Sequence, residues 1–73
     1  MPEWPVLSGA EVVKALERLG FRQVRQKGSH VVMRRGDQGC VVPLHRVVKT
    51  GTLAGLVRQA RLSPVEFLDA ASR

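Results

Sequence analysis

The hydrophobic residues of this 73-residue chain change their spacing twice along the sequence. Near the N-terminus, Val12, Val13, Leu16 and Leu19 recur at the three- to four-residue spacing of a helix. The middle of the chain holds short β-branched segments between turn-forming residues, and beyond residue 50 the helical spacing returns. A change from helix to strand and back to helix predicts an α+β domain.

Two capping-box patterns, each a serine followed three residues later by a glutamate, indicate where helices begin. They start at Ser8 and at Ser63, and a proline at the first helical position strengthens the second. We expect a first helix over about Gly9–Leu19 and a last, short helix over Pro64–Ala71.

Three strands are expected, over Phe21–Gln26, His30–Arg34 and Cys40–Leu44, and a second amphipathic helix should begin near Thr50 or Thr52. Both main helices carry one apolar face, so we expect them on one side of a three-stranded antiparallel sheet. The order α-β-β-β-α plus a short C-terminal helix, in one domain over residues 1–73, resembles the two-layer double-stranded-RNA-binding fold. The other side of the sheet would be open to a partner.

Positive charge is concentrated in the middle of the chain. Twelve Lys and Arg against six Asp and Glu give a net charge of +6, and between Arg18 and Arg61 the only acid is Asp37. This distribution favours a polyanionic partner such as RNA, because each phosphate contact releases counterions. The alternative is an arginine-rich surface without such a partner.

Several site classes lack support in the sequence. Cys40 is the only cysteine, so no internal disulfide is expected, and a buried thiol in a cytoplasmic protein is the simplest interpretation. Cys40, His30 and His45 are too few for a zinc site, and no phosphate-binding loop suggests a nucleotide cofactor. No apolar run could span a membrane and no signal peptide is expected. Trp4 is expected to pack at the edge of the core rather than to stack on a base.

The segment "KGSH", residues 27–30, is the strongest candidate site. A histidine at the start of a strand is usually an ordinary polar residue, but here a cation, a flexible glycine and a hydroxyl precede it. Such a histidine can act as general base or acid while the 2′-hydroxyl of RNA attacks the adjacent phosphorus, a reaction that requires no metal. The expected catalytic residue is His30, and the expected RNA-binding residues are Lys27, Gly28, Ser29, Arg25 and Arg34.

A second histidine is a possible auxiliary. If the last hairpin is centred between Asp37 and Gln38, His30 lies directly opposite His45, with Cβ atoms about 5 Å apart. The two imidazoles could then divide acid and base roles or share a phosphate. The alternative is that His45, which follows Pro43, has left the sheet and only ends the strand.

Five segments, "LGF", "KGSH", "VP" followed by "H", "KTGTL" and "RQARLSPVEF", resemble the HicA toxins of type II toxin–antitoxin systems, over Ser8 to Phe67. The resemblance implies a double-stranded-RNA-binding-like fold, ribonuclease activity on mRNA and inhibition by a cognate HicB antitoxin. It also implies that the catalytic histidine is His30. Many members carry a second histidine directly after it, where this chain has Val31.

We therefore expect a metal-independent endoribonuclease toxin. A non-catalytic RNA-binding module with the same fold is the competing hypothesis. A third, a basic interaction domain for an acidic antitoxin, is compatible with the first.

Overall fold

The computed structural model describes residues 3–73, which form helices and strands in the order α-β-β-β-α-α. The elements are α1 (Gly9–Arg18), β1 (Arg22–Lys27), β2 (His30–Arg35), β3 (Gln38–Pro43), α2 (Thr50–Gln59) and α3 (Pro64–Ala71). Each limit that was predicted lies within two residues of the observed one, and the predicted α+β class is confirmed.

The strands form one antiparallel sheet in the order β1-β2-β3, with a two-residue turn between neighbours. Each turn begins with a glycine at positive φ, +58° at Gly28 and +62° at Gly36. A type II′ turn requires this conformation at its first central position, and glycine adopts it without steric cost.

The predicted register of the second hairpin is wrong. Its turn is formed by Gly36 and Asp37, one position earlier than expected, so β2 and β3 pair with a two-residue offset. As a result His30 pairs with Pro43, and His45 lies beyond the end of β3. The turn forms at Gly36 because a glycine accepts the positive φ that the first turn residue must adopt.

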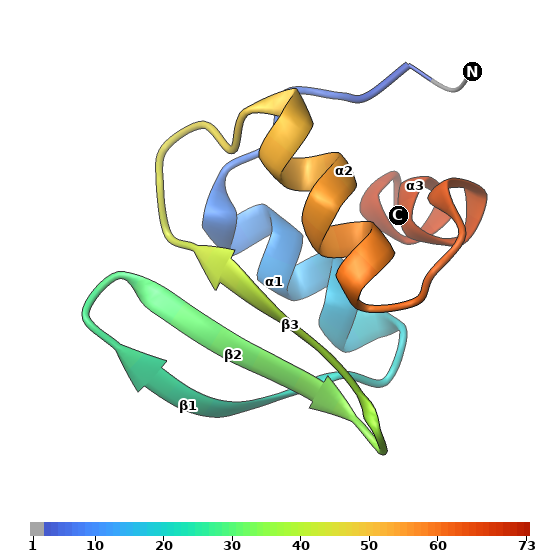
Figure 1. Ribbon diagram of the computed structural model, residues 1–73. Coiled ribbons are helices and arrows are strands. Elements are labelled where there is room, and N and C mark those ends of the chain that lie inside the picture. The colour runs from blue at the N-terminus through green and yellow to red at the C-terminus, as the bar shows by residue number, and fades with distance from the viewer. Residues whose placement is uncertain (1–2) are drawn as a thin grey trace.

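The helices lie on one side of the sheet, as predicted (Figure 1). α1 and α2 pack against β3, and α3 packs against α1. A single apolar cluster fills the space between the layers, with Leu16, Phe21, Met33, Leu53 and Phe67 among its fully buried side chains. β1 has its main contacts with β2, and all six of its residues are exposed.

Local interactions at the ends of the elements follow the sequence signals. The Ser8 and Ser63 capping boxes are both formed, with hydrogen bonds in each direction between serine and glutamate. Trp4 is half-buried against Phe67, with ring centroids 6.3 Å apart, so the predicted packing role is confirmed. Among residues 3–73, no helix has the length and apolar character needed to cross a bilayer.

Candidate functional site

The two histidines lie side by side although they are not paired in the sheet. His30 is the first residue of β2 and His45 belongs to the loop after β3, and both are exposed. Their ring centroids are 6.4 Å apart and the rings meet edge to face at 71°. Across residues 3–73, neither imidazole has a hydrogen-bond partner, so the ring nitrogens are free to meet a ligand.

Backbone hydrogen bonds hold the loop of His45 against two other segments. The Leu44 N–H donates to the carbonyl of Ser29 in the β1–β2 turn, at 2.6 Å. The Gly9 N–H, at the start of α1, donates to the carbonyl of His45, at 2.9 Å. The last residues of β3 and the β1–β2 turn lie at the same end of the sheet (Figure 1). The two hydrogen bonds therefore hold the loop after β3 next to His30.

Gly9 permits this arrangement because it has no side chain. A Cβ atom at this position would overlap the carbonyl oxygen of Pro43 and would lie 2.6 Å from the Cα of Leu44. Sequence reasoning treated Gly9 only as the first residue of a helix. The available signal was its poor helix propensity, which suggests a packing or functional reason for a glycine at that position.

The other residues predicted around His30 come together at the β1–β2 turn. Lys27 is the cross-strand partner of His30, and Gly28 and Ser29 form the turn between them. A Cβ at Gly28 would meet open space, so this glycine is required by its φ of +58° and not by a close contact within the protein. The turn therefore presents a cation and a hydroxyl beside an exposed imidazole.

Arg25 and Arg34, also predicted to bind RNA, lie further along the same side of the sheet. Val31 and Met33 are buried, so the alternate residues of β2, including Arg34, point away from the helices. Arg25 shares this side because it pairs with Val32.

Arg22 is a residue that sequence reasoning missed. It pairs with Arg34 and therefore lies on the same side of the sheet, although it is three positions from Arg25. An irregularity between Gln23 and Arg25 leaves Val24 without a partner in the register. Strict alternation, the only signal in the sequence, would have placed Arg22 and Arg25 on opposite sides.

Arg35 lies on the other side of the sheet and has a structural role. Its guanidinium donates to the carbonyl of Leu19 at 2.6 Å and to the side chain of Gln38, and it lies 4.8 Å from the ring centroid of Phe21. These contacts link β2 and β3 to the end of α1. Arg35 is therefore engaged in the fold and does not contribute to an open basic surface.

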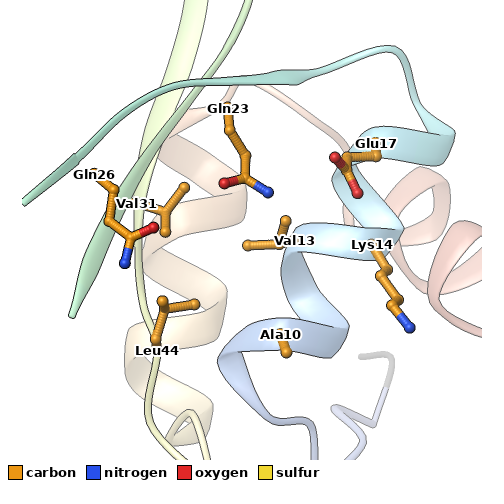
Figure 2. A pocket seen from close by; sticks show the side chains of 8 residues that line it. All are labelled: Ala10, Val13, Lys14, Glu17, Gln23, Gln26, Val31 and Leu44. Carbon is orange, nitrogen blue, oxygen red and sulfur yellow. The ribbon is translucent and has the colours of Figure 1, made fainter.

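A groove of about 300 Å³ lies between α1 and β1 on this helical side. Figure 2 shows Gln23 and Gln26 projecting from β1 toward α1, over Val13 and Val31. The charged side chains that line it are Lys14 and Glu17, one of each sign. Since its charges balance, this groove has no preference for a polyanion.

The structure offers little for metal or thiol chemistry. Within residues 3–73 no three His, Cys, Asp or Glu side chains come together as metal ligands. Burial raises the pKa of the Cys40 thiol to about 11, so Cys40 stays protonated at neutral pH and is a poor nucleophile or ligand.

Comparison of the sequence with models of known protein families gives one match. Residues 9–62 match the family model for the HicA toxin of bacterial toxin–antitoxin systems, which is well over half of the chain. The matched region includes both histidines and all three strands. No individual curated protein matches the chain.

Proposed function

The chain belongs to the HicA toxin family of bacterial toxin–antitoxin systems, and we propose that it is an endoribonuclease that cleaves mRNA without a metal, with His30 as general base or acid. The observation that supports this most directly is the exposed imidazole of His30, whose ring centroid lies 6.4 Å from that of His45. Lys27 pairs with His30 across the hairpin and supplies a cation for the scissile phosphate.

The proposed reaction is an internal transfer at one phosphate. One imidazole accepts the proton of the 2′-hydroxyl, whose oxygen forms a bond to the adjacent phosphorus. The bond from phosphorus to the 5′-oxygen breaks, and that oxygen receives a proton from the other imidazole, which acts as the general acid. The products are a 2′,3′-cyclic phosphate and a 5′-hydroxyl end, and no water, oxidant or metal is consumed.

The separation of the two rings is compatible with one shared phosphate. Two N–H···O contacts of about 2.8 Å, made to one oxygen or to two oxygens of the same phosphate, need nitrogens about 5 to 8 Å apart. The ring centroids of His30 and His45 are 6.4 Å apart, and each ring nitrogen lies about 1 Å from its centroid, so nitrogens of the two rings can fall within that range. We therefore assign His45 as the auxiliary group, while Lys27, Gly28, Ser29, Arg25 and Arg34 hold the RNA.

The partner that follows from the family is an antitoxin, and we propose a HicB-type protein that inhibits by covering His30. The net charge of +6 favours an acidic surface on that protein. Since His30 and the turn beside it are exposed, a bound antitoxin can exclude RNA from the site without changing the fold.

Expression of the wild type and of His30→Ala in a bacterium tests the enzymatic part. We expect the wild type to arrest growth and the variant not to, because loss of a general acid or base costs about 10²- to 10⁴-fold in rate. The purified wild type should cleave RNA in the presence of a chelator, and the variant should still bind it. Equal cleavage by both proteins removes His30 from the mechanism, and binding without cleavage by the wild type favours the non-catalytic RNA-binding module.

His45→Ala separates the auxiliary role from the main one. A lower cleavage rate with unchanged RNA binding supports a catalytic contribution from His45. Cleavage at the wild-type rate would show that His30 acts without it.

A further inference from the structure

The side of the sheet away from the helices, which we call the outer face, is lined by cations from two strands. Residues that pair directly across strands share a face, so the register defines the set. It consists of Arg22, Arg25, Lys27, His30, Val32, Arg34, Gly39, Val41 and Pro43, and the last of these is buried. No acid belongs to this set, and Asp37, the one acid within β1 to β3 and their turns, forms an ion pair with Arg61.

The cations on the outer face form a path that ends at the proposed active site. Arg22 pairs with Arg34 at one end of the sheet, Arg25 lies in the middle, and Lys27 pairs with His30 at the other end. Successive residues on one face of a strand are about 6.6 Å apart. This spacing is close to that of consecutive phosphates along a nucleic acid strand, so one strand can place a phosphate at each cation.

A shallow hollow of about 280 Å³ lies beside this path, over β2 and β3, where Val32 and Val41 form a cross-strand pair. Arg34, Asp37, Cys40 and Gln59 also line it. Gly39, opposite Arg34, has no side chain to fill it. Val41 is 40% exposed, so the valine pair contributes apolar surface in contact with solvent. A partly exposed valine pair beside Arg25 and Arg34 suits the flat face of a nucleobase.

The aromatic residues of the chain lie elsewhere. Phe21 and Phe67 are buried in the core, and Trp4 packs against Phe67. The outer face therefore lacks the aromatic platform on which many RNA-binding sheets stack bases. Binding here has to rest mainly on phosphates, with the valine pair as a site for one base.

We propose that the outer face binds single-stranded RNA on one side of the scissile phosphate, with phosphates along Arg22, Arg25 and Lys27 and one base over Val32 and Val41. This proposal rests on the proposed function for the position of the cut. A single strand is required because in-line attack needs the 2′-oxygen, the phosphorus and the 5′-oxygen collinear, which a stacked A-form helix does not allow. The regular spacing of the cations favours RNA over an acidic protein.

The test measures binding with cleavage removed. In a His30→Ala background, Arg22→Gln/Arg25→Gln is compared with Lys14→Gln/Arg58→Gln, which removes the same charge from exposed positions on the helices. The probe is a fluorescently labelled single-stranded RNA of about ten nucleotides, with a duplex of the same sequence as a second probe. Anisotropy titrations at several salt concentrations give the dissociation constant and its salt dependence.

For single strands the logarithm of the binding constant falls with the logarithm of salt by about 0.7 per phosphate contact. Loss of two contacts therefore lowers this slope by about 1.4 and weakens binding about 25-fold at 0.1 M salt. We expect this from the outer-face pair and less than a threefold change from the helix pair. In the same background, Val32→Thr/Val41→Thr should weaken binding severalfold with the salt slope unchanged.

An equal or larger loss from the helix pair, or tighter binding of the duplex than of the single strand, overturns the proposal. So does a result in which the outer-face pair loses antitoxin binding and keeps RNA binding. These outcomes leave the proposed function intact if the wild type still cleaves RNA. If the wild type does not cleave while binding follows the outer-face cations, the proposed function fails and the binding surface stands.

Discussion

Gly9→Ala should disturb the loop that carries His45. The new methyl group would overlap the Pro43 carbonyl oxygen and lie 2.6 Å from the Cα of Leu44, and both neighbours are backbone atoms that cannot rotate away. Overpacking of this kind costs about 1 to 3 kcal/mol, and the better helix propensity of alanine offsets about 0.5 to 1 kcal/mol. We expect a net loss of about 1 to 2 kcal/mol, which lowers the Tm by about 5 to 15 °C for a domain of this size.

Gly51→Ala is the matched control, because Gly51 lies in the first turn of α2 and a Cβ there would meet open space. This variant should be neutral or more stable by up to about 1 kcal/mol. Thermal unfolding followed by circular dichroism compares the two. Equal Tm values for Gly9→Ala and Gly51→Ala would refute the argument that α1 approaches the loop too closely for any side chain.

The effect of Gly9→Ala on cleavage should act through His45. We expect a lower cleavage rate at a temperature where the variant is folded, because the displaced loop carries His45 away from His30. In a His45→Ala background the same substitution should lower the rate no further, since the group it displaces is already absent. Additive losses in the double variant would mean that Gly9 affects the site by another route.

Three other predictions concern the backbone, the thiol and the strand irregularity. Arg61 has a positive φ of 58°, so Arg61→Gly should have a free energy of unfolding in urea about 0.5 to 1 kcal/mol higher than Arg61→Ala. Both variants lose the same exposed ion pair with Asp37, but only the alanine variant keeps the strained backbone, so equal stability would argue against strain. Because burial raises the pKa of Cys40 to about 11, its alkylation in the native protein should be far slower than in urea, and equal rates would contradict its burial. Deletion of Val24 keeps every remaining pair in register, whereas deletion of Gln26 turns Arg25 toward the helices. RNA binding should survive the first deletion and weaken in the second, and the opposite order would refute the register.

Most of the fold could be predicted because its signals are local. The helix limits follow from capping boxes and apolar spacing, and α3 matches its prediction at both ends, where Ser63 and Pro64 fix the start. The hairpin register failed although a local signal was present. Only a glycine takes a positive φ without strain at the first turn position, and Gly36, not Asp37, meets that requirement.

The candidate site was harder to predict because its geometry depends on contacts between distant segments. The exposure of His30 could not be predicted from the sequence; it arises because His30 alternates with the buried Val31 and so lies on the outer face. The approach of His45 was expected for the wrong reason, since the two residues are not paired. The rings are close because the bonds of Leu44 with Ser29 and of Gly9 with His45 join segments distant in the sequence, which no short-range pattern reveals.

Departures from regular structure recur around the proposed RNA path, but they do not by themselves mark a site. The positive φ of Gly28, the close approach at Gly9 and the unpaired Val24 each affect where a histidine or an arginine lies. Gly36 has the same turn conformation at the far end of the sheet, where no histidine lies, and it serves only to connect two strands. The first three differ from Gly36 because they bring exposed functional groups together, namely two imidazoles and a line of cationic side chains. Departures from regular local structure are therefore expected where function requires an unusual side-chain position. Whether a given departure belongs to a functional site is indicated by the exposed side chains next to it.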